Sequence, residues 1–345
     1  MQVCEAIERM TRGGSLGYED TREMFARILR NEESAMEQGA FLAVMTMKGA
    51  DIGELAAIRD AVRNVDTVTV EIRTDRPLCD NCGSGADTFK TFNISTAAAI
   101  TAACLGAAVA RHGSRSITSG CGTVDLCEAL GIDVSASPLQ VAASVESCGL
   151  GLFNGNDISV HPTGLFRILS DIHFGTVLNN AASMASPASP QYGLRGVNDP
   201  ALLTQMARLM KRAGYRRAMT VFGKVDGTDL FMDEASTLGE TLYVMIDEHG
   251  KVTEGSFRPQ DMGLPPGRAE DVTAWGSVDR EAERMRSILR GEGSRSCRDI
   301  AALNCGLLLF TAGLAPTAPQ GVAMALETLG SGRCLDKLEE WRRCQ

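Results

Sequence analysis

The sequence predicts an α/β protein, in which a small N-terminal α-helical domain precedes a larger α/β domain with a central mixed sheet flanked by helices. Apolar residues recur at helical spacing from residue 1 to about residue 64. Beyond that point short β-rich runs alternate with helical runs, as in an α/β domain. The chain has 345 residues, 44% of them hydrophobic, which is enough for one large and one small domain.

The first predicted domain covers residues 1–66. We expect helices over 18–29, 35–47 and 52–62, because apolar residues recur there at helical spacing and Gly-Gly and Lys-Gly breaks separate the runs. An alternating run over 67–72 predicts a strand in the connection to the second domain. The apolar surplus of the helices serves either a bundle core or a subunit contact.

The second predicted domain covers residues 67–345. Its expected elements are a helix over 97–110 whose last residues lead into a loop, a short element over 126–130, a helix over 201–213, strands over 217–221 and 242–246, and helices over 319–330 and 336–343. The order of the strands in the sheet cannot be read from one sequence.

The charge balance disfavours a nucleic-acid partner. Lys and Arg number 34 against 43 Asp and Glu, for a net charge of −9, and no run of basic residues stands out. The N-terminus lacks the apolar segment of a signal peptide, and no apolar stretch is long enough to cross a bilayer. We therefore expect a cytoplasmic protein without a membrane partner.

A glycine-rich turn over residues 83–96, Gly-Ser-Gly-Ala-Asp-Thr-Phe-Lys-Thr-Phe-Asn-Ile-Ser-Thr, has the chemistry of a phosphate cradle. Glycines allow backbone N–H groups to converge on an anion, the following helix adds its positive N-terminal end, and hydroxyls add donors. Asp87 does not suit a bare anion site, so it indicates a divalent cation or a sugar hydroxyl. The alternative is an ordinary strand-to-helix turn capped by Ser95 or Thr96.

A second turn-rich segment, residues 111–125, combines two arginines, a histidine, three glycines and several hydroxyls. It is suited to anions, and together the two segments fit a ligand with two phosphate groups. An ordinary solvated connection is the alternative.

The chain contains eleven cysteines, which we expect to be free thiols in a reducing compartment. Cys79 and Cys82 have the Cys-x-x-Cys spacing of redox and zinc motifs, but zinc requires a second pair, and Cys121 and Cys127 are too widely spaced to supply it. Structural thiols are the main interpretation. The alternative is that oxidation of Cys82 or Cys121, which lie beside the two turns, blocks the site.

The two segments resemble the signatures of the anthranilate phosphoribosyltransferase family. GSGADTFKTFNIST is similar to Gly-Thr-Gly-Gly-Asp…Thr-x-Asn-x-Ser-Thr, and RHGSR at residues 111–115 is similar to Lys-His-Gly-Asn-Arg. Residues 232–241 resemble the paired acidic motif of the family, Asp-Glu followed by Ser and Gly-x-Thr. The similarity extends along essentially the whole chain.

The resemblance implies the donor 5-phosphoribosyl-1-pyrophosphate (PRPP), a small aromatic acceptor, Mg²⁺ as cofactor, and a homodimer formed through the helical domain, which a segment near 163–182 completes. Carried over residue by residue, it implies PRPP binding by Gly83, Ala86, Asp87, Thr91, Asn93, Ile94, Ser95, Thr96, Arg111, His112, Gly113, Ser119 and Thr123. It implies Mg²⁺ binding by Ser95, Asp233 and Glu234, and acceptor binding by Gly83, Ser114, His161 and Arg167. No nucleophile or general base is expected, because departure of pyrophosphate requires charge neutralisation and alignment.

The departures from the family pattern concentrate in the acceptor half. Ser114 stands at the family's asparagine, Gly175 at its second arginine, and residues 182–186 replace Gly-Pro-Leu-x-Asn. Arg167 supplies a carboxylate-binding guanidinium only if gaps are placed around it. In the donor half, Arg111 replaces a lysine and brings a forked rather than a point charge.

The link over 224–231, which leads to the acid pair, is longer than in the family. Its two additional carboxylates either extend the metal site or belong to a surface loop.

The sequence therefore predicts a Mg²⁺-dependent phosphoribosyltransferase that acts on a small aromatic amine, aromatic acid or nitrogen heterocycle, with anthranilate as the best single candidate. Two alternatives stay open at this point. One is a non-catalytic relative that binds nucleic acid or another phosphate polymer, and the other is a nucleoside phosphorylase.

Overall fold

The computed structural model describes residues 1–116, 120–172 and 174–345. Its helices are α1 Val3–Thr11, α2 Tyr18–Leu29, α3 Ala35–Lys48, α4 Ile52–Val65, α5 Ile94–Cys104, α6 Thr123–Ala129, α7 Pro138–Cys148, α8 Leu165–Asp171, α9 Val177–Ala182, α10 Leu203–Arg212, α11 Ala269–Val272, α12 Val278–Leu289, α13 Arg295–Thr311, α14 Ala318–Gly330 and α15 Arg333–Cys344. Short 3₁₀ helices cover Pro200–Leu202 and Pro259–Met262. The strands are β1 Leu78–Cys82, β2 Ala108–Gly113, β3 Leu150–Asn154, β4 Tyr192–Gly196, β5 Arg217–Lys224, β6 Phe231–Met232, β7 Thr241–Ile246 and β8 Val252–Phe257.

The strands form one mixed sheet with the order β3-β2-β1-β4-β5-β7-β8, in which β6 also pairs with β5. Strands β3, β2, β1, β4 and β5 run parallel. Strands β6, β7 and β8 continue the sheet in antiparallel pairs. The predicted mixed α/β sheet is therefore confirmed.

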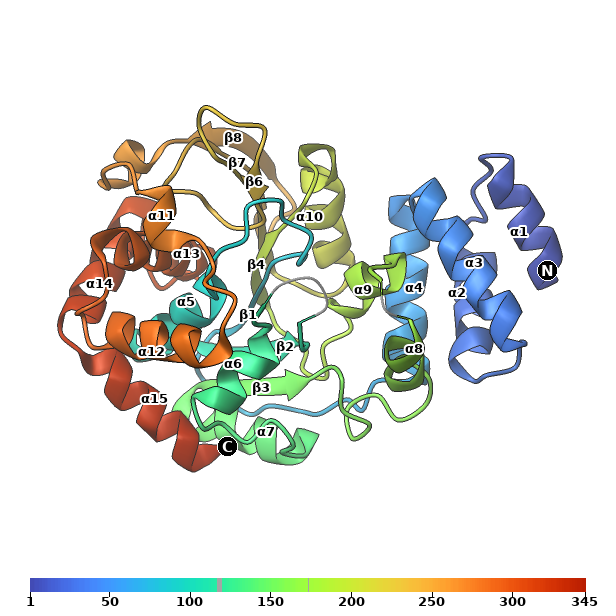
Figure 1. Ribbon diagram of the computed structural model, residues 1–345, viewed down its shortest axis with the longest axis horizontal. Coiled ribbons are helices and arrows are strands. Elements are labelled where there is room, and N and C mark those ends of the chain that lie inside the picture. The colour runs from blue at the N-terminus through green and yellow to red at the C-terminus, as the bar shows by residue number, and fades with distance from the viewer. Residues whose placement is uncertain (117–119, 173) are drawn as a thin grey trace.

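Helices cover both faces of the sheet (Figure 1). On one face α5, α12, α13, α14 and α15 enclose a large apolar core with side chains of β1, β2 and β4. Along β2 the alternate residues Ala108 and Ala110 point to the opposite face, where they meet α7. Strands buried on both faces require continuous apolar runs, which explains the run Ala107–Ala110.

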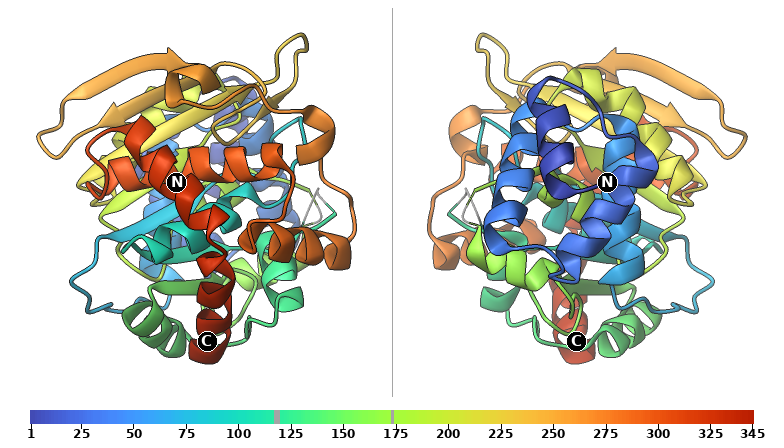
Figure 2. Two further views of the ribbon diagram at one scale, coloured as in Figure 1. Left: turned by 90° about the vertical axis from the view of Figure 1, so that its left-hand side faces the viewer. Right: turned by 90° about the vertical axis from the view of Figure 1, so that its right-hand side faces the viewer.

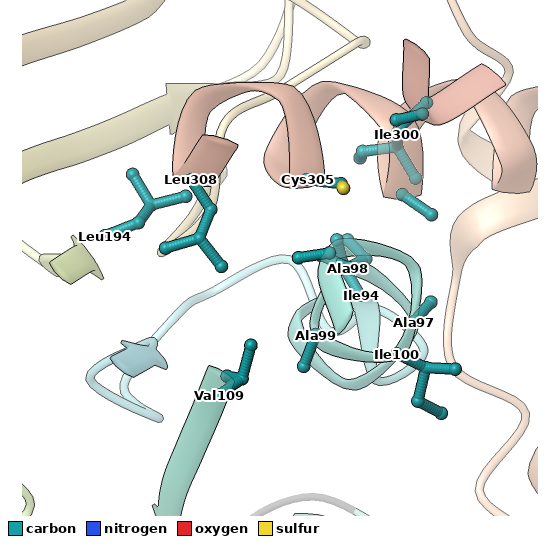
Figure 3. Close-up of a cluster of buried hydrophobic side chains, with 14 of the residues drawn as sticks. Ile94, Ala97, Ala98, Ala99, Ile100, Val109, Leu194, Ile300, Cys305 and Leu308 are labelled. Atoms are coloured by element: carbon teal, nitrogen blue, oxygen red, sulfur yellow. The ribbon is translucent and has the colours of Figure 1, made fainter. Parts of the chain in front are cut away.

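Helix α5 lies at the centre of this core, between the sheet and α13 (Figure 3). Its small side chains, such as Ala98, allow close approach to Cys305 and Leu308 of α13, and Val109 of β2 lies on the other side. These four side chains are at most 1% exposed. The packing fixes the direction of α5, whose N-terminal end follows the glycine-rich turn.

The N-terminal helices α1–α4 form a bundle beside the sheet (Figure 2). Ser34 and Asp51 cap α3 and α4 by accepting hydrogen bonds from the N–H groups of Glu37 and Glu54. Leu165 of α8 and Leu178 of α9 share the apolar cluster of this bundle, which extends to α10 and β5. The segment between β3 and β4 thus packs on the bundle.

The C-terminal helix α15 runs along the sheet domain from α5 towards the edge strand β3 (Figure 2). There the side-chain amide of Gln345 accepts a hydrogen bond from the N–H of Leu152 (3.0 Å) and donates one to the carbonyl of the same residue (3.0 Å). A side chain thereby occupies both hydrogen-bonding groups of one residue of the edge strand.

Two predicted elements were wrong. Residues 67–72 are not a strand of the sheet, because the N–H groups of Val68 and Val70 bond instead to the loop carbonyls of Val160 and Pro187. The helix predicted over 97–110 ends at Cys104, since Gly106 has a φ of +95° that a helix cannot accept. The last residues of the predicted helix belong to β2.

Candidate active site

The site lies where the order of the parallel strands reverses. Strand β1 has β2 on one side, which follows it in the chain, and β4 on the other. The loops after β1 and β4 leave the same edge of the sheet in opposite directions, and a crevice between such loops is the usual ligand site of an open α/β sheet. The glycine-rich turn follows β1 at this position.

Asp233 connects the glycine-rich turn to the acidic loop, the segment after β6 that carries Asp233 and Glu234. Its carboxylate accepts hydrogen bonds from the N–H of Gly85 (2.6 Å) and the hydroxyl of Ser84 (2.7 Å). A Cβ on Gly83 would lie 2.5 Å from Asp233 Oδ1, and a Cβ on Gly196, at the end of β4, would overlap the backbone of Asp233. Only glycine at these two positions leaves room for the acidic loop to cross the crevice.

Three carboxylates meet in the crevice. Burial and the neighbouring charges of Asp233 and Asp87 raise the pKa of Glu234 well above its ordinary value. Burial and Asp233 also raise the pKa of Asp87, although Lys90 forms an ion pair with that carboxylate at 2.8 Å. The site therefore has an excess of negative charge that a cation would relieve.

A small cavity beside these acids has oxygen donors in its wall. Asn81, Ser95, Asp233 and Glu234 line it. Asn81 donates to the carbonyl of Ser95 (2.7 Å), while among the described residues its own side-chain oxygen has no hydrogen-bond partner. The Ser95 hydroxyl lies 3.4 Å from Glu234 Oε1.

These donors fit Mg²⁺, which prefers oxygen ligands and is usually held by one or two carboxylates together with substrate phosphates and water. In the part of the chain that the structure describes, no three His, Cys, Asp or Glu side chains are arranged to hold a metal ion by themselves. An ion bound here would therefore complete its shell with other oxygens.

Helix α13 fixes the backbone of the acidic loop through Asn304. The Asn304 side chain accepts a hydrogen bond from the N–H of Ala235 (3.0 Å) and donates one to the carbonyl of the same residue (3.0 Å). These two bonds fix the backbone that follows Asp233 and Glu234.

Arg111 connects β2 to β1 and α5. Its buried guanidinium donates to the Thr96 hydroxyl (2.5 Å) and to the carbonyl of Asn81 (3.4 Å). The guanidinium thus contacts the first turn of α5. Its contact with a phosphate group stays a prediction.

His112 and His161 form a buried pair with their Nε2 atoms 3.1 Å apart. Burial lowers the pKa of His161 to about 4, and burial together with His161 lowers that of His112 well below its ordinary value. At neutral pH both rings are therefore uncharged, and neither adds positive charge for an anion.

The second turn-rich segment begins inside β2, because residues 111–113 belong to that strand, and its last residues, 123–125, belong to α6. Asp125 closes it by accepting hydrogen bonds from the N–H groups of Ser116 and Gly122. Arg115 bonds to Asp125 (3.0 Å) and Glu128 (2.7 Å), so its charge is already balanced. Ser119, which we expected in the phosphate shell, lies outside the described residues.

The other predicted donor residues surround the start of α5. Asn93 is its N-cap residue, Ile94 is buried, and Ala86 is exposed in the turn. Thr91 forms an isolated β-bridge with Thr273. Gly113 packs against Thr123, whose methyl carbon would be 3.0 Å from an added Cβ.

The predicted acceptor residues are not gathered in the same way. Ser114 is exposed, whereas the guanidinium of Arg167 donates to the carbonyl of Ile28 (3.0 Å) and to Gln38 (3.0 Å) in the helical bundle. Arg167 thus joins α8 to α2 and α3, and a role in carboxylate binding stays a prediction. A Cβ on Gly175 would meet no atom of the described structure within 4 Å.

Two further expectations are settled by geometry. Cys79 and Cys82 occupy strand β1, where residues three apart point to opposite faces, so this Cys-x-x-Cys is not a redox pair. Both are free thiols. In the link before the acid pair, Asp226 forms an exposed ion pair with Arg258 (2.7 Å), as a surface loop would.

Sequence reasoning missed Asn81, Gly196 and Asn304. Asn81 had a usable signal, since Asp80 and Asn81 are adjacent polar residues in a buried central strand. Gly196 and Asn304 act only through contacts with residues distant in the chain, which one sequence does not reveal.

Fold and site together define an α/β protein with a candidate ligand site at the switch point of its sheet. In agreement, residues 75–335 match the glycosyl transferase family a/b domain, and residues 5–65 match the helical bundle domain of that family. The anthranilate phosphoribosyltransferase of Nitrosospira multiformis is 33% identical over 99% of this chain and 95% of its own length. The chain therefore belongs to the anthranilate phosphoribosyltransferase family.

Two solved structures extend the likeness to three dimensions. Anthranilate phosphoribosyltransferase from Thermus thermophilus has a TM-score of 0.83 at 28% identity, covering 98% of both chains. The enzyme from Saccharomyces cerevisiae in complex with PRPP and Mg has a TM-score of 0.84 at 20% identity, covering 99% of this chain and 97% of its own, and shares the fold. No helix among the described residues is long and apolar enough to span a membrane.

Proposed function

We propose that this protein transfers the 5-phosphoribosyl group of PRPP to anthranilate, releases pyrophosphate and requires Mg²⁺. The observation that supports this best is the direct bonding of the glycine-rich turn to Asp233 at the switch point, because it joins an anion-binding backbone to a cation-binding carboxylate. The names of the relatives agree with this reaction.

In this proposal the start of α5 binds the phosphates of the donor. The N–H groups of the first turn, together with the hydroxyls of Ser95 and Thr96, donate to phosphate oxygens, and the helix terminus adds positive potential. Arg111 holds Thr96 in place and adds a buried positive charge. Gly83, Ala86, Asp87, Thr91, Asn93, Ile94, His112, Gly113, Ser119 and Thr123 complete the proposed donor site.

Bound Mg²⁺ would neutralise charge that develops on the departing pyrophosphate. Asp233, Glu234 and Ser95 are its proposed protein ligands. The acceptor amine needs only to be held in line with ribose C1, since positioning supplies a large part of the acceleration in such a reaction.

The proposed acceptor site includes Gly83, Ser114, His161 and Arg167. His161 and His112 are neutral, so they are suited to orient an aromatic amine rather than to bind its carboxylate. Gly175 leaves open space where the family pattern has an arginine, so we expect anthranilate to be bound less tightly than that pattern would allow.

The test incubates the purified protein with PRPP, Mg²⁺ and either anthranilate or a panel of aromatic amines and acids, with pyrophosphate and phosphate measured separately. Phosphoribosyl-anthranilate and pyrophosphate are the expected products. If the phosphoribosyl group is transferred only to other amines, the proposed reaction type holds and the proposed acceptor is wrong. Consumption of phosphate with a nucleoside would indicate a phosphorylase, and no turnover of PRPP with any acceptor would refute the proposal.

A substitution tests the acceptor site. Gly175→Arg should raise kcat/KM for anthranilate by roughly 10-fold, because a guanidinium can form a charge-assisted pair with its carboxylate. Gly175→Met, of similar length but uncharged, is the control. An equal effect of both variants would contradict the assignment.

We also propose domains over 1–66 and 67–345, with residues 163–182 packed on the first, and a cytoplasmic homodimer formed by the helical domain. Exposed Met36 (86%) and Met47 (78%) on α3 support a contact there, and eleven free thiols support a reducing compartment. The double variant Met36→Glu, Met47→Glu should be monomeric in sedimentation.

A further inference from the structure

Two cysteines that the proposed reaction does not use face each other between α5 and α15. Cys104 is the last residue of α5, and Cys334 is in the first turn of α15. Their sulfur atoms are 3.9 Å apart, with the Cys104 thiol donating towards Cys334. A disulfide requires about 2.05 Å, so the sulfurs must approach by roughly 2 Å.

The environment favours reaction at this pair. Cys104 is part of the wall of a surface cavity whose remaining lining is charged, from Arg333, Asp336, Lys337, Glu340 and Arg343. A small polar oxidant can therefore reach one sulfur, while Cys334 is fully buried behind it. The N-terminal end of α15 and Arg333 both favour a thiolate at Cys334.

The sulfurs differ in acidity. The hydrogen bond from Cys104 lowers the pKa of Cys334, and Arg333 acts in the same direction. The same hydrogen bond, together with burial, raises the pKa of Cys104, so the proton of the pair rests on Cys104 and the Cys334 sulfur is placed to accept it when Cys104 reacts.

We propose that Cys104 and Cys334 are a redox modification site, at which a peroxide converts the two thiols into a reversible disulfide that fastens α15 to α5. As the proton of Cys104 passes to the Cys334 thiolate, the Cys104 sulfur attacks a peroxide oxygen and the O–O bond breaks, which gives a sulfenic acid and hydroxide. The hydroxide takes the proton back from Cys334 and leaves as water. The Cys334 sulfur then displaces the hydroxyl from Cys104 as a second water. Two thiols are oxidised, one peroxide is reduced to two waters, and a dithiol reverses the step.

The link would hold the ends of a long chain segment together. The cysteines are 230 residues apart in sequence, and α15 reaches from α5 to the edge strand β3. Closing so long a loop restricts the unfolded chain, so we expect oxidation to raise the Tm by about 5 °C.

The other end of α15 has a second thiol contact, because Cys344 lies beside Cys148 of α7, whose pKa is raised by burial and, to a smaller extent, by Cys344. This contact makes it necessary to identify which bond forms. A Cys344→Ser variant removes the second contact and leaves the first.

The experiment treats the reduced full-length chain with one equivalent of hydrogen peroxide and then denatures and alkylates it. We expect nine alkylated thiols instead of eleven, a linked peptide containing Cys104 and Cys334, a higher Tm, and reversal by dithiothreitol. Cys104→Ser should abolish the link and the rise in Tm. Cys4→Ser, at an exposed thiol of α1, is the matched control and should change neither.

The proposal is overturned if Cys104→Ser loses two thiols as the wild type does, or if the linked peptide contains other cysteines. It is also overturned if peroxide oxidises Cys4 while all other thiols remain. Because Cys334 is buried, its variant is not required for the test, and peptide mapping of the wild type reports on its role directly.

Discussion

The donor half and the acceptor half of the crevice are constructed differently. The described residues of the proposed donor site lie in the turn after β1, at the start of α5, at the end of β2 and at the start of α6, and hydrogen bonds such as that from Gly85 to Asp233 stabilise this region. Of the proposed acceptor residues, His161 and Arg167 lie in the connection between β3 and β4, where α8 and α9 have only seven and six residues. Motifs are retained where the backbone is fixed, and they are altered where loops carry the residues.

This difference has a physical basis. A phosphate cradle depends on backbone N–H groups, so its geometry is lost when the glycines or the helix start change. Acceptor contacts come from individual side chains on short elements, which can be replaced without moving the sheet. Substitutions in the donor half should therefore affect catalysis, and those in the acceptor half should affect affinity or stability.

The largest effect is expected from the acid pair. Glu234→Gln should lower kcat/KM by roughly 1,000-fold, because one charged oxygen is removed from the proposed metal site. The matched control is Asp226→Asn, in the link before the pair, where loss of an exposed ion pair should leave kcat/KM unchanged. A steady-state assay with varied Mg²⁺ measures both, and equal activities would remove Glu234 from the site.

The second-largest effect is expected from added side-chain volume at Gly83 and involves no change of charge. Gly83→Ala should lower kcat by roughly 100-fold, because its Cβ would displace the Asp233 carboxylate and misalign the site. Gly175→Ala has open space and should retain activity. The comparison is made at saturating PRPP and anthranilate, and an active Gly83→Ala variant would mean that the turn and Asp233 need not touch.

Substitution of Arg167 tests its contributions to acceptor affinity and to thermal stability separately. Arg167→Met should reduce the Tm by roughly 2–6 °C, since two hydrogen bonds to the bundle are lost, and raise the KM for anthranilate by roughly 10-fold, because the proposed acceptor site loses a guanidinium. Arg22→Met, on the surface of α2, is the control and should change the Tm by less than about 1 °C. A reduced Tm with an unchanged acceptor KM would remove Arg167 from the proposed acceptor site.

The smallest effect concerns pH. Since the pKa of Glu234 is raised in the folded chain above its ordinary 4.5, its contribution to stability is present below that pH and is lost as the pH rises through the folded-state pKa. Mg²⁺ needs the ionised form, so the rise in Tm that Mg²⁺ produces should grow by roughly 2 °C between pH 5 and pH 8. Calorimetry of wild type and Glu234→Gln measures this, and the variant should show no growth.

The fold class and the donor motifs could be predicted because they depend on local patterns. The glycines before α5 and the helical spacing before residue 64 are properties of adjacent residues. The end of α5 could not be predicted, because an alanine-rich run suits both a helix and a buried strand, and Gly106 alone marks the change. Asn304 and Gly196 were missed because their roles arise from contacts with a loop distant in the chain.

The paired amide of Gln345 bears on how the protein avoids strand pairing with another chain at the edge of its sheet. An edge strand with free N–H and carbonyl groups is a template for another chain. Gln345 pairs with both the N–H and the carbonyl of Leu152 on β3. A variant without this amide, such as Gln345→Ala, would leave these two groups of the edge strand open to pairing with another chain.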